Sequence, residues 1–87
     1  MRLDVFLKQS RLIKRRTVAR EACERGLVLL NGRVGKPASE VKVGDTIALT
    51  LGSRHLTVQV VSLPESPRAA DATGMYRTLA DETGPAV

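Results

Sequence analysis

Residues 10–20 read SRLIKRRTVAR, and this stretch joins two segments with helical spacing. Five of its eleven residues are basic and none is acidic; the cations are Arg11, Lys14, Arg15, Arg16 and Arg20. The stretch leads into a predicted helix, whose N-terminus already carries a partial positive charge and unpaired backbone N–H groups. Because cations are unfavourable at that end, the stretch predicts a binding site for an anion.

Hydrophobic spacing predicts a helix on each side of the basic stretch. Residues 2–10 form the first, because their apolar residues recur at i, i+3 and i+4: Leu3, Phe6 and Leu7. Residues 16–25 form the second, with one face made of Val18, Ala19, Ala22 and Cys23. Gly26 suits the left-handed conformation that ends many helices.

Strand signals follow the second helix. Residues 27–30 form a short apolar run, and Asn31-Gly32 after it is a strong hairpin-turn signal. Residues 46–51 predict another strand, and residues 55–63 alternate between apolar and polar side chains. Two helices followed by antiparallel strands predict an α+β fold.

We expect residues 1–63 to form one domain. Residues 64–74 are rich in Pro, Ala, Ser and Asp, a composition typical of a linker. The remaining residues to 87 are expected to be a C-terminal tail, with a short helix near residues 75–79.

Positive charge is concentrated in the first part of the chain. The 87 residues carry a formal net charge of +5; residues 1–36 hold ten basic and three acidic residues, whereas residues 37–87 hold four and six. This asymmetry predicts a localised footprint for a polyanion. Charge alone does not distinguish RNA from DNA, but two aromatic residues are too few for base stacking along a single strand. Contact with the phosphates of a folded RNA fits better.

Motifs for catalysis are missing. One His and one Cys are too few for a zinc site, and the glycines form no phosphate-binding loop, so we expect a non-enzymatic protein without a cofactor. Cys23 is expected to be a buried structural thiol. No apolar run could span a membrane, and a basic helix without a large apolar face is a poor membrane-surface binder. A single cysteine fits a reducing compartment, and we expect a cytoplasmic protein.

Helical spacing separates the arginines of the second helix. Arg16 and Arg20 lie four residues apart and repel each other, whereas Glu21 precedes Arg25 in the favourable order for an ion pair. Arg25 is therefore expected to be structural, and Arg16 and Arg20 to be unpaired binding candidates. The spacing of Asp4 predicts an acid that complements the first turn of its helix.

Several short motifs resemble, in their order, the RNA-binding domain first named from ribosomal small-subunit protein S4, also called the alpha-L motif. They are RLD at 2–4, FL at 6–7, RRTVAR at 15–20, GLV at 26–28, NGRV at 31–34, PAS at 37–39 and VGD at 43–45. The resemblance covers about residues 1–60 and implies two helices packed on a small, curved antiparallel sheet. It also implies an RNA-binding face lined by Arg2, Lys8, Arg11, Lys14, Arg15, Arg16 and Arg20. Asn31, Arg33 and Lys36 would flank that face, and Asp4 would orient a neighbouring arginine.

Residues 10–17 and the late Met75-Tyr76 resemble the short bacterial ribosome quality-control members of that family, relatives of a ribosome-associated heat-shock protein. This resemblance implies a monomer that binds large ribosomal subunits obstructed by peptidyl-tRNA. Its partners would be large-subunit rRNA, the peptidyl-tRNA and a quality-control elongation factor of the NEMF/RqcH kind, which adds C-terminal alanines to the stalled chain. An alternative is a stand-alone module that targets a separate enzyme to the rRNA or tRNA it modifies.

Overall fold

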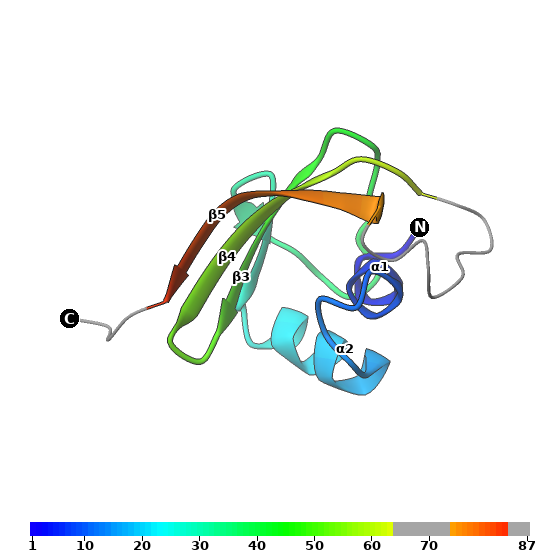
Figure 1. Cartoon of the computed structure of the whole chain (residues 1–87). Helices are drawn as coiled ribbons and strands as arrows, with labels where there is room; N and C mark the ends of the chain where they lie inside the picture. Colours follow the sequence, from blue (N-terminus) through cyan, green and yellow to red (C-terminus); the bar gives the residue numbers. More distant parts are fainter. Residues whose placement is uncertain (64–73, 84–87) are drawn as a thin grey trace.

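The computed structural model describes residues 1–63 and 74–83, in which two helices pack against a five-stranded antiparallel sheet (Figure 1). The helices are α1 (Leu3–Gln9) and α2 (Arg16–Glu24). The strands are β1 (Val28–Leu30), β2 (Arg33–Val34), β3 (Thr46–Leu51), β4 (Arg54–Val60) and β5 (Tyr76–Thr83). They lie in the order β2-β1-β3-β4-β5, which confirms the α+β prediction.

The core lies between the helices and one face of the sheet. Helix α1 contributes Leu3, Phe6 and Leu7, none of which is exposed to solvent. Helix α2 contributes only small side chains, namely Ala19, Ala22 and Cys23. The prediction that Val18 shares this face is wrong, because Val18 is 49% exposed. At about 100° per residue, it lies at the margin of the stripe that Ala19 and Cys23 define.

Alternation along the central strands determines the inner face of the sheet. Leu56 and Val58 on β4 are buried and pair with Leu49 and Ile47 on β3, which are buried too. Thr57, between them, is only partly buried and belongs to the opposite face. This period of two is the pattern expected of a sheet with one face on the core.

The Asn31-Gly32 hairpin is confirmed. These residues join β1 to β2 with φ angles of +52° and +82°. Two consecutive positive φ angles are the requirement of the tight turns that match the twist of paired strands, which is why Asn-Gly is favoured there.

The predicted short helix near residues 75–79 is wrong, because β5 begins at Tyr76. The strand pairs antiparallel with β4 from Val60–Tyr76 to Arg54–Thr83, and a register shift leaves Leu79 as an extra residue opposite Thr57 and Val58. Strand β5 depends on pairing with a distant strand, and a short window of local sequence does not reveal such pairing. Of the predicted linker at residues 64–74, only Gly74 falls within the described residues.

The segment after the hairpin folds back onto the start of α1. The amide of Leu3 donates to the carbonyl of Ser39 (2.8 Å), and the amide of Asp4 donates to the carbonyl of Pro37 (3.1 Å). These bonds satisfy N–H groups of the first turn that have no partner within the helix. Gly35 is buried, and a Cβ atom there would collide with the Leu3 side chain. Glycine therefore allows the return segment, with Lys36 on it, to lie against the first turn of α1.

Candidate nucleic-acid interface

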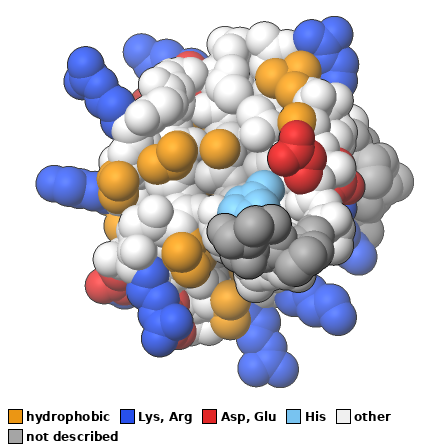
Figure 2. Space-filling view, turned by 90° about the vertical axis from the view of Figure 1, so that its left-hand side faces the viewer, with side chains coloured by type: hydrophobic (Ala, Val, Ile, Leu, Met, Phe, Trp, Pro, Cys, Tyr) orange, Lys and Arg blue, Asp and Glu red, His pale blue; other side chains and the backbone are white. Residues whose placement is uncertain are grey.

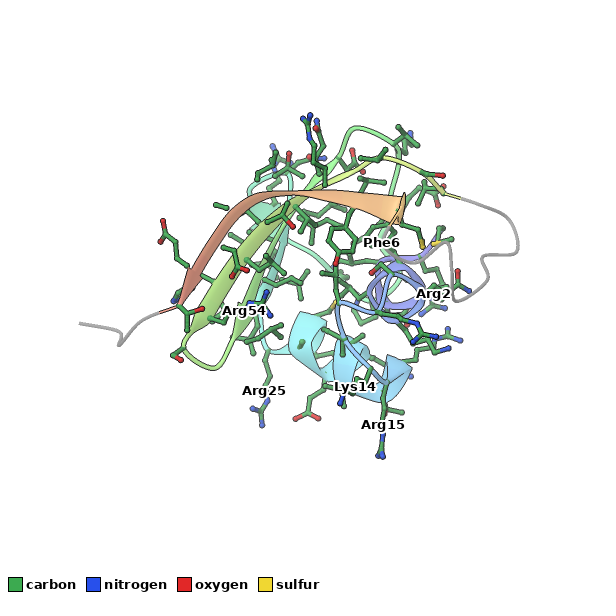
Figure 3. All side chains as sticks on the ribbon, viewed as in Figure 1. Arg2, Phe6, Lys14, Arg15, Arg25 and Arg54 are labelled. Atoms are coloured by element: carbon green, nitrogen blue, oxygen red, sulfur yellow. The ribbon has the colours of Figure 1, made fainter. Side chains whose placement is uncertain are left out.

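The basic stretch forms a tight, well-anchored turn between α1 and α2. The Ser10 hydroxyl donates to the carbonyl of Leu7 (3.2 Å), and the amide of Ile13 donates to the same carbonyl (3.0 Å). Ile13 is only 6% exposed and Leu12 packs against the core. Because the apolar residues hold the turn down, its cations are left in solvent; Lys14 and Arg15 are seen around the helices in Figure 3, with Arg2 beside α1.

Asp4 is the centre of the candidate interface. Its carboxylate is fully buried, and both of its oxygens accept hydrogen bonds. Oδ1 accepts from the amide of Val5 (2.8 Å) and from Arg2 Nε (3.2 Å). Oδ2 accepts from Arg2 Nη2 (3.2 Å) and from Arg16 Nε (3.4 Å). One carboxylate therefore joins the residue before α1 to the first residue of α2 and fixes two guanidinium groups side by side.

The two arginines keep donors that Asp4 does not use. Arg16 binds Asp4 through Nε alone, so both of its Nη groups are available. Arg2 uses Nε and Nη2 and retains Nη1. Their side chains are about half exposed, at 55% for Arg16 and 48% for Arg2. A guanidinium held in this way presents a planar fork that matches phosphate oxygens.

Four further cations lie on α1 and on the turn that follows it. Lys8, Arg11, Lys14 and Arg15 are all exposed. Within residues 1–63 and 74–83, no acidic group lies within ion-pair distance of these four. Their charge is therefore available to a ligand.

Two ion pairs on α2 settle the roles predicted for its arginines. Arg25 Nη2 lies 3.3 Å from Glu21 Oε1, so the predicted structural pair is confirmed. The prediction that Arg16 is unpaired is wrong, because its Nε lies 3.4 Å from Asp4 Oδ2. The same prediction for Arg20 is also wrong, because its Nε lies 3.7 Å from Glu24 Oε1. Glu24 follows Arg20 by one turn, and residues four apart face each other on a helix. Both pairs within α2 are exposed, and such pairs contribute at most about 1 kcal/mol.

The hairpin residues have different surroundings. The side-chain amide of Asn31 is occupied within the fold: Nδ2 donates to Asp45 Oδ1 (3.1 Å), and Oδ1 accepts from the amide of Thr46 (2.9 Å). Asn31 thus ties the hairpin to the start of β3, a role that sequence reasoning missed. Arg33 and Lys36 are exposed, Arg33 on β2 at the edge of the sheet and Lys36 beside the first turn of α1.

The open face of the sheet is different in character. A row of paired residues crosses all five strands, from Val34 through Leu29, Ala48 and Thr57 to Ala80, and contains no charge. Figure 2 views the molecule from the side away from α1, where lysine and arginine side chains project around the outline and hydrophobic groups and the single His lie inside it. The cations of α1 and the turn that have no acidic neighbour lie on the helix side of the molecule, which is therefore the candidate nucleic-acid interface.

Among the residues the structure describes, no three His, Cys, Asp or Glu side chains gather closely enough to hold a metal ion. No helix in the same part of the chain is long and apolar enough to cross a membrane. The fixed and free cations on the helix side are therefore suited to binding an anion. Cys23 on α2 is the other group whose chemistry we consider.

Cys23 is a buried thiol, as its place on α2 predicts. Burial, followed by the negative charges of Asp4 and Glu24, raises its pKa from the ordinary 9.0 to about 11. The native state therefore keeps the thiol protonated at pH values where the unfolded chain has already released the proton. This difference makes stability depend on pH above 9.

We expect the free energy of unfolding to fall as pH rises from 9 to 11, because the unfolded state then binds fewer protons than the native state. The contribution of Cys23 should be about 1 kcal/mol between pH 8 and pH 10. Urea unfolding of the parent and of Cys23→Ala at both pH values measures it, since the two proteins differ only in this side chain. An equal loss in the two proteins would contradict the role of the thiol.

Known proteins share this architecture and much of the sequence. The model of the S4 domain family matches residues 1–47. The chain is 45% identical to the RQC P-site tRNA stabilizing factor of Bacillus subtilis over 82 aligned residues. The alignment covers 94% of this chain and 95% of that protein. The protein of the same name from Halalkalibacterium halodurans is 44% identical over 82 residues, 94% of this chain and 93% of that protein. The trimeric structure of Vibrio cholerae heat shock protein 15 is similar with a TM-score of 0.83 at 34% identity, over 92% of this chain and 82% of that one.

Proposed function

The chain belongs to the S4 domain family, within the group of RQC P-site tRNA stabilizing factors, and on this premise we propose that it is a non-enzymatic RNA-binding factor of ribosome-associated quality control. Its binding target is the large ribosomal subunit obstructed by peptidyl-tRNA. It contacts rRNA and tRNA together and works in the cytoplasm, where ribosomes are found.

One observation carries this proposal: the buried Asp4 carboxylate holds Arg2 and Arg16 beside a turn whose cations have no acidic neighbour. Nothing in the packing of the core requires two arginines on Asp4 and four further cations on α1 and the turn after it. Phosphates do, because the Nη groups that Asp4 leaves free on the two fixed guanidinium groups can donate hydrogen bonds to phosphate oxygens.

The form of the nucleic acid follows from the side chains that are absent. The chain has one Phe and one Tyr; Phe6 is fully buried, and Tyr76 is half-buried against the core. Stacking of unpaired bases needs exposed aromatic rings, so recognition relies on phosphates and shape. Folded RNAs such as rRNA and tRNA supply both.

The rigid helix pair suggests how the factor acts. Donors that Asp4 and the anchored turn hold in place lose little side-chain entropy on binding, which favours a long-lived contact. Bound between rRNA and tRNA, the protein would steady the tRNA while a quality-control elongation factor of the NEMF/RqcH kind adds C-terminal alanines to the stalled chain. Peptide transfer itself remains the chemistry of the ribosome.

Cross-linking in cells followed by sequencing of the bound RNA tests the proposal. We expect reads from large-subunit rRNA together with tRNA, and shorter alanine tails on stalled chains when the gene is deleted. Reads dominated by mRNA would overturn the proposal. A pull-down dominated by an RNA-modifying enzyme, without ribosomal subunits, would favour the alternative of a targeting module.

A further inference from the structure

Helix α1 ends at an arginine with left-handed backbone geometry. Arg11 follows the C-cap residue Ser10 and has a φ angle of +64°. Its amide donates to the carbonyl of Lys8 (3.0 Å), which closes the last turn of the helix. For any residue with a Cβ atom this conformation is unfavourable, and glycine is the usual choice at this position.

Helix α2 ends in the same way, but with glycine. Gly26 follows the C-cap residue Arg25 with a φ angle of +74°, and its amide donates to the carbonyl of Cys23 (3.0 Å). A Cβ atom at Gly26 would meet no other atom within 4 Å, so the backbone angle alone favours glycine there. The chain therefore meets one structural requirement twice, with the favoured residue at α2 and with arginine at α1.

Contacts within the described fold do not explain this arginine. Arg11 is exposed and has no acidic neighbour within ion-pair distance in residues 1–63 and 74–83. A cation near a helix C-terminus is favourable, but Lys8 already supplies one in the last turn of α1. Neither packing nor pairing compensates for the backbone conformation.

We propose that Arg11 is a binding residue whose guanidinium contacts an RNA phosphate, and that the chain keeps arginine at this left-handed position at the expense of fold stability. This inference rests on the proposed function and adds to it a specific contact outside the Asp4 cluster. Such strain is maintained at functional positions where the surrounding structure fixes the conformation.

Substitution Arg11→Gly separates the two effects. We expect its Tm to rise by about 3 °C, because glycine adopts the left-handed angle freely. We expect its affinity for purified large subunits carrying peptidyl-tRNA to fall about tenfold, with the slope of log affinity against log salt reduced by about one. Arg11→Lys should lose less affinity, since lysine keeps the charge without the fork.

The reverse exchange, Gly26→Arg, is the matched control for strain, and its Tm should fall. A lower Tm for Arg11→Gly would show that arginine stabilises the turn, and unchanged affinity would show that it is no RNA contact; either result overturns the inference. The proposed function fails separately, if the parent protein itself does not bind these subunits.

Discussion

Replacing Arg2 and Arg16 together with alanine is expected to lower the free energy of unfolding by about 2–3 kcal/mol, because the buried Asp4 carboxylate then loses both of its cations. Only the amide of Val5 would still donate to it. The carboxylate is fully buried in the parent protein, so its negative charge depends on the partners that the fold supplies. Urea unfolding of the double variant beside the parent measures the loss.

A third substitution isolates the cause of that loss. Asparagine at position 4 keeps an oxygen for the amide of Val5 and carries no charge, so Asp4→Asn added to the double variant should recover most of the stability. Binding to RNA should not recover, since both arginines are still missing. A double variant as stable as the parent would show that the half-exposed arginines do not act as counter-ions of Asp4.

Much of the fold could be predicted from the sequence because its signals are local. Hydrophobic spacing identifies α1 and α2, and the Asn31-Gly32 pair identifies the hairpin by its required backbone angles. The strand β5 could not be found in this way, because its hydrogen bonds go to β4 across the 64–74 segment. The local sequence around Tyr76 is compatible with either a helical turn or a strand. The free edge of β4 favours the strand, because it offers backbone hydrogen bonds.

The candidate interface could be predicted in composition but not in geometry. Charge clustering identifies the cations around residues 10–20, yet the pairing of Asp4 with Arg16 and the packing of the return segment on the first turn of α1 arise from tertiary contact. Sequence spacing also treats Arg20 as free, although Glu24 lies one turn further along the same helix. Asn31 carries a turn signal, but the bonds of its amide to Asp45 and Thr46 arise from tertiary contact.

Arg16→Ala alone is expected to weaken binding to obstructed large subunits by about 10- to 100-fold while the domain stays folded. A hydrogen-bonded contact between a guanidinium and a phosphate contributes about 1.5–3 kcal/mol, and Arg16 retains both Nη groups for it. Stability should change little, because Arg2 remains on Asp4 through two hydrogen bonds. The slope of log affinity against log salt should also decrease by about one.

Arg25→Ala is the matched control, since it removes the same charge from the same helix. Figure 3 shows Arg25 at the end of α2 that lies away from Arg15, and Glu21 already accepts an ion pair from it at 3.3 Å. Co-sedimentation with large subunits over a salt series should therefore show a loss below about twofold for this variant, because distant exposed charges are largely screened. Equal losses for the two variants would mean that the protein responds to total charge alone, and the guanidinium pair on Asp4 would then have no special role in binding. A larger loss for Arg16→Ala would instead locate the interaction where the first turns of α1 and α2 meet, at the arginines that the buried Asp4 carboxylate holds.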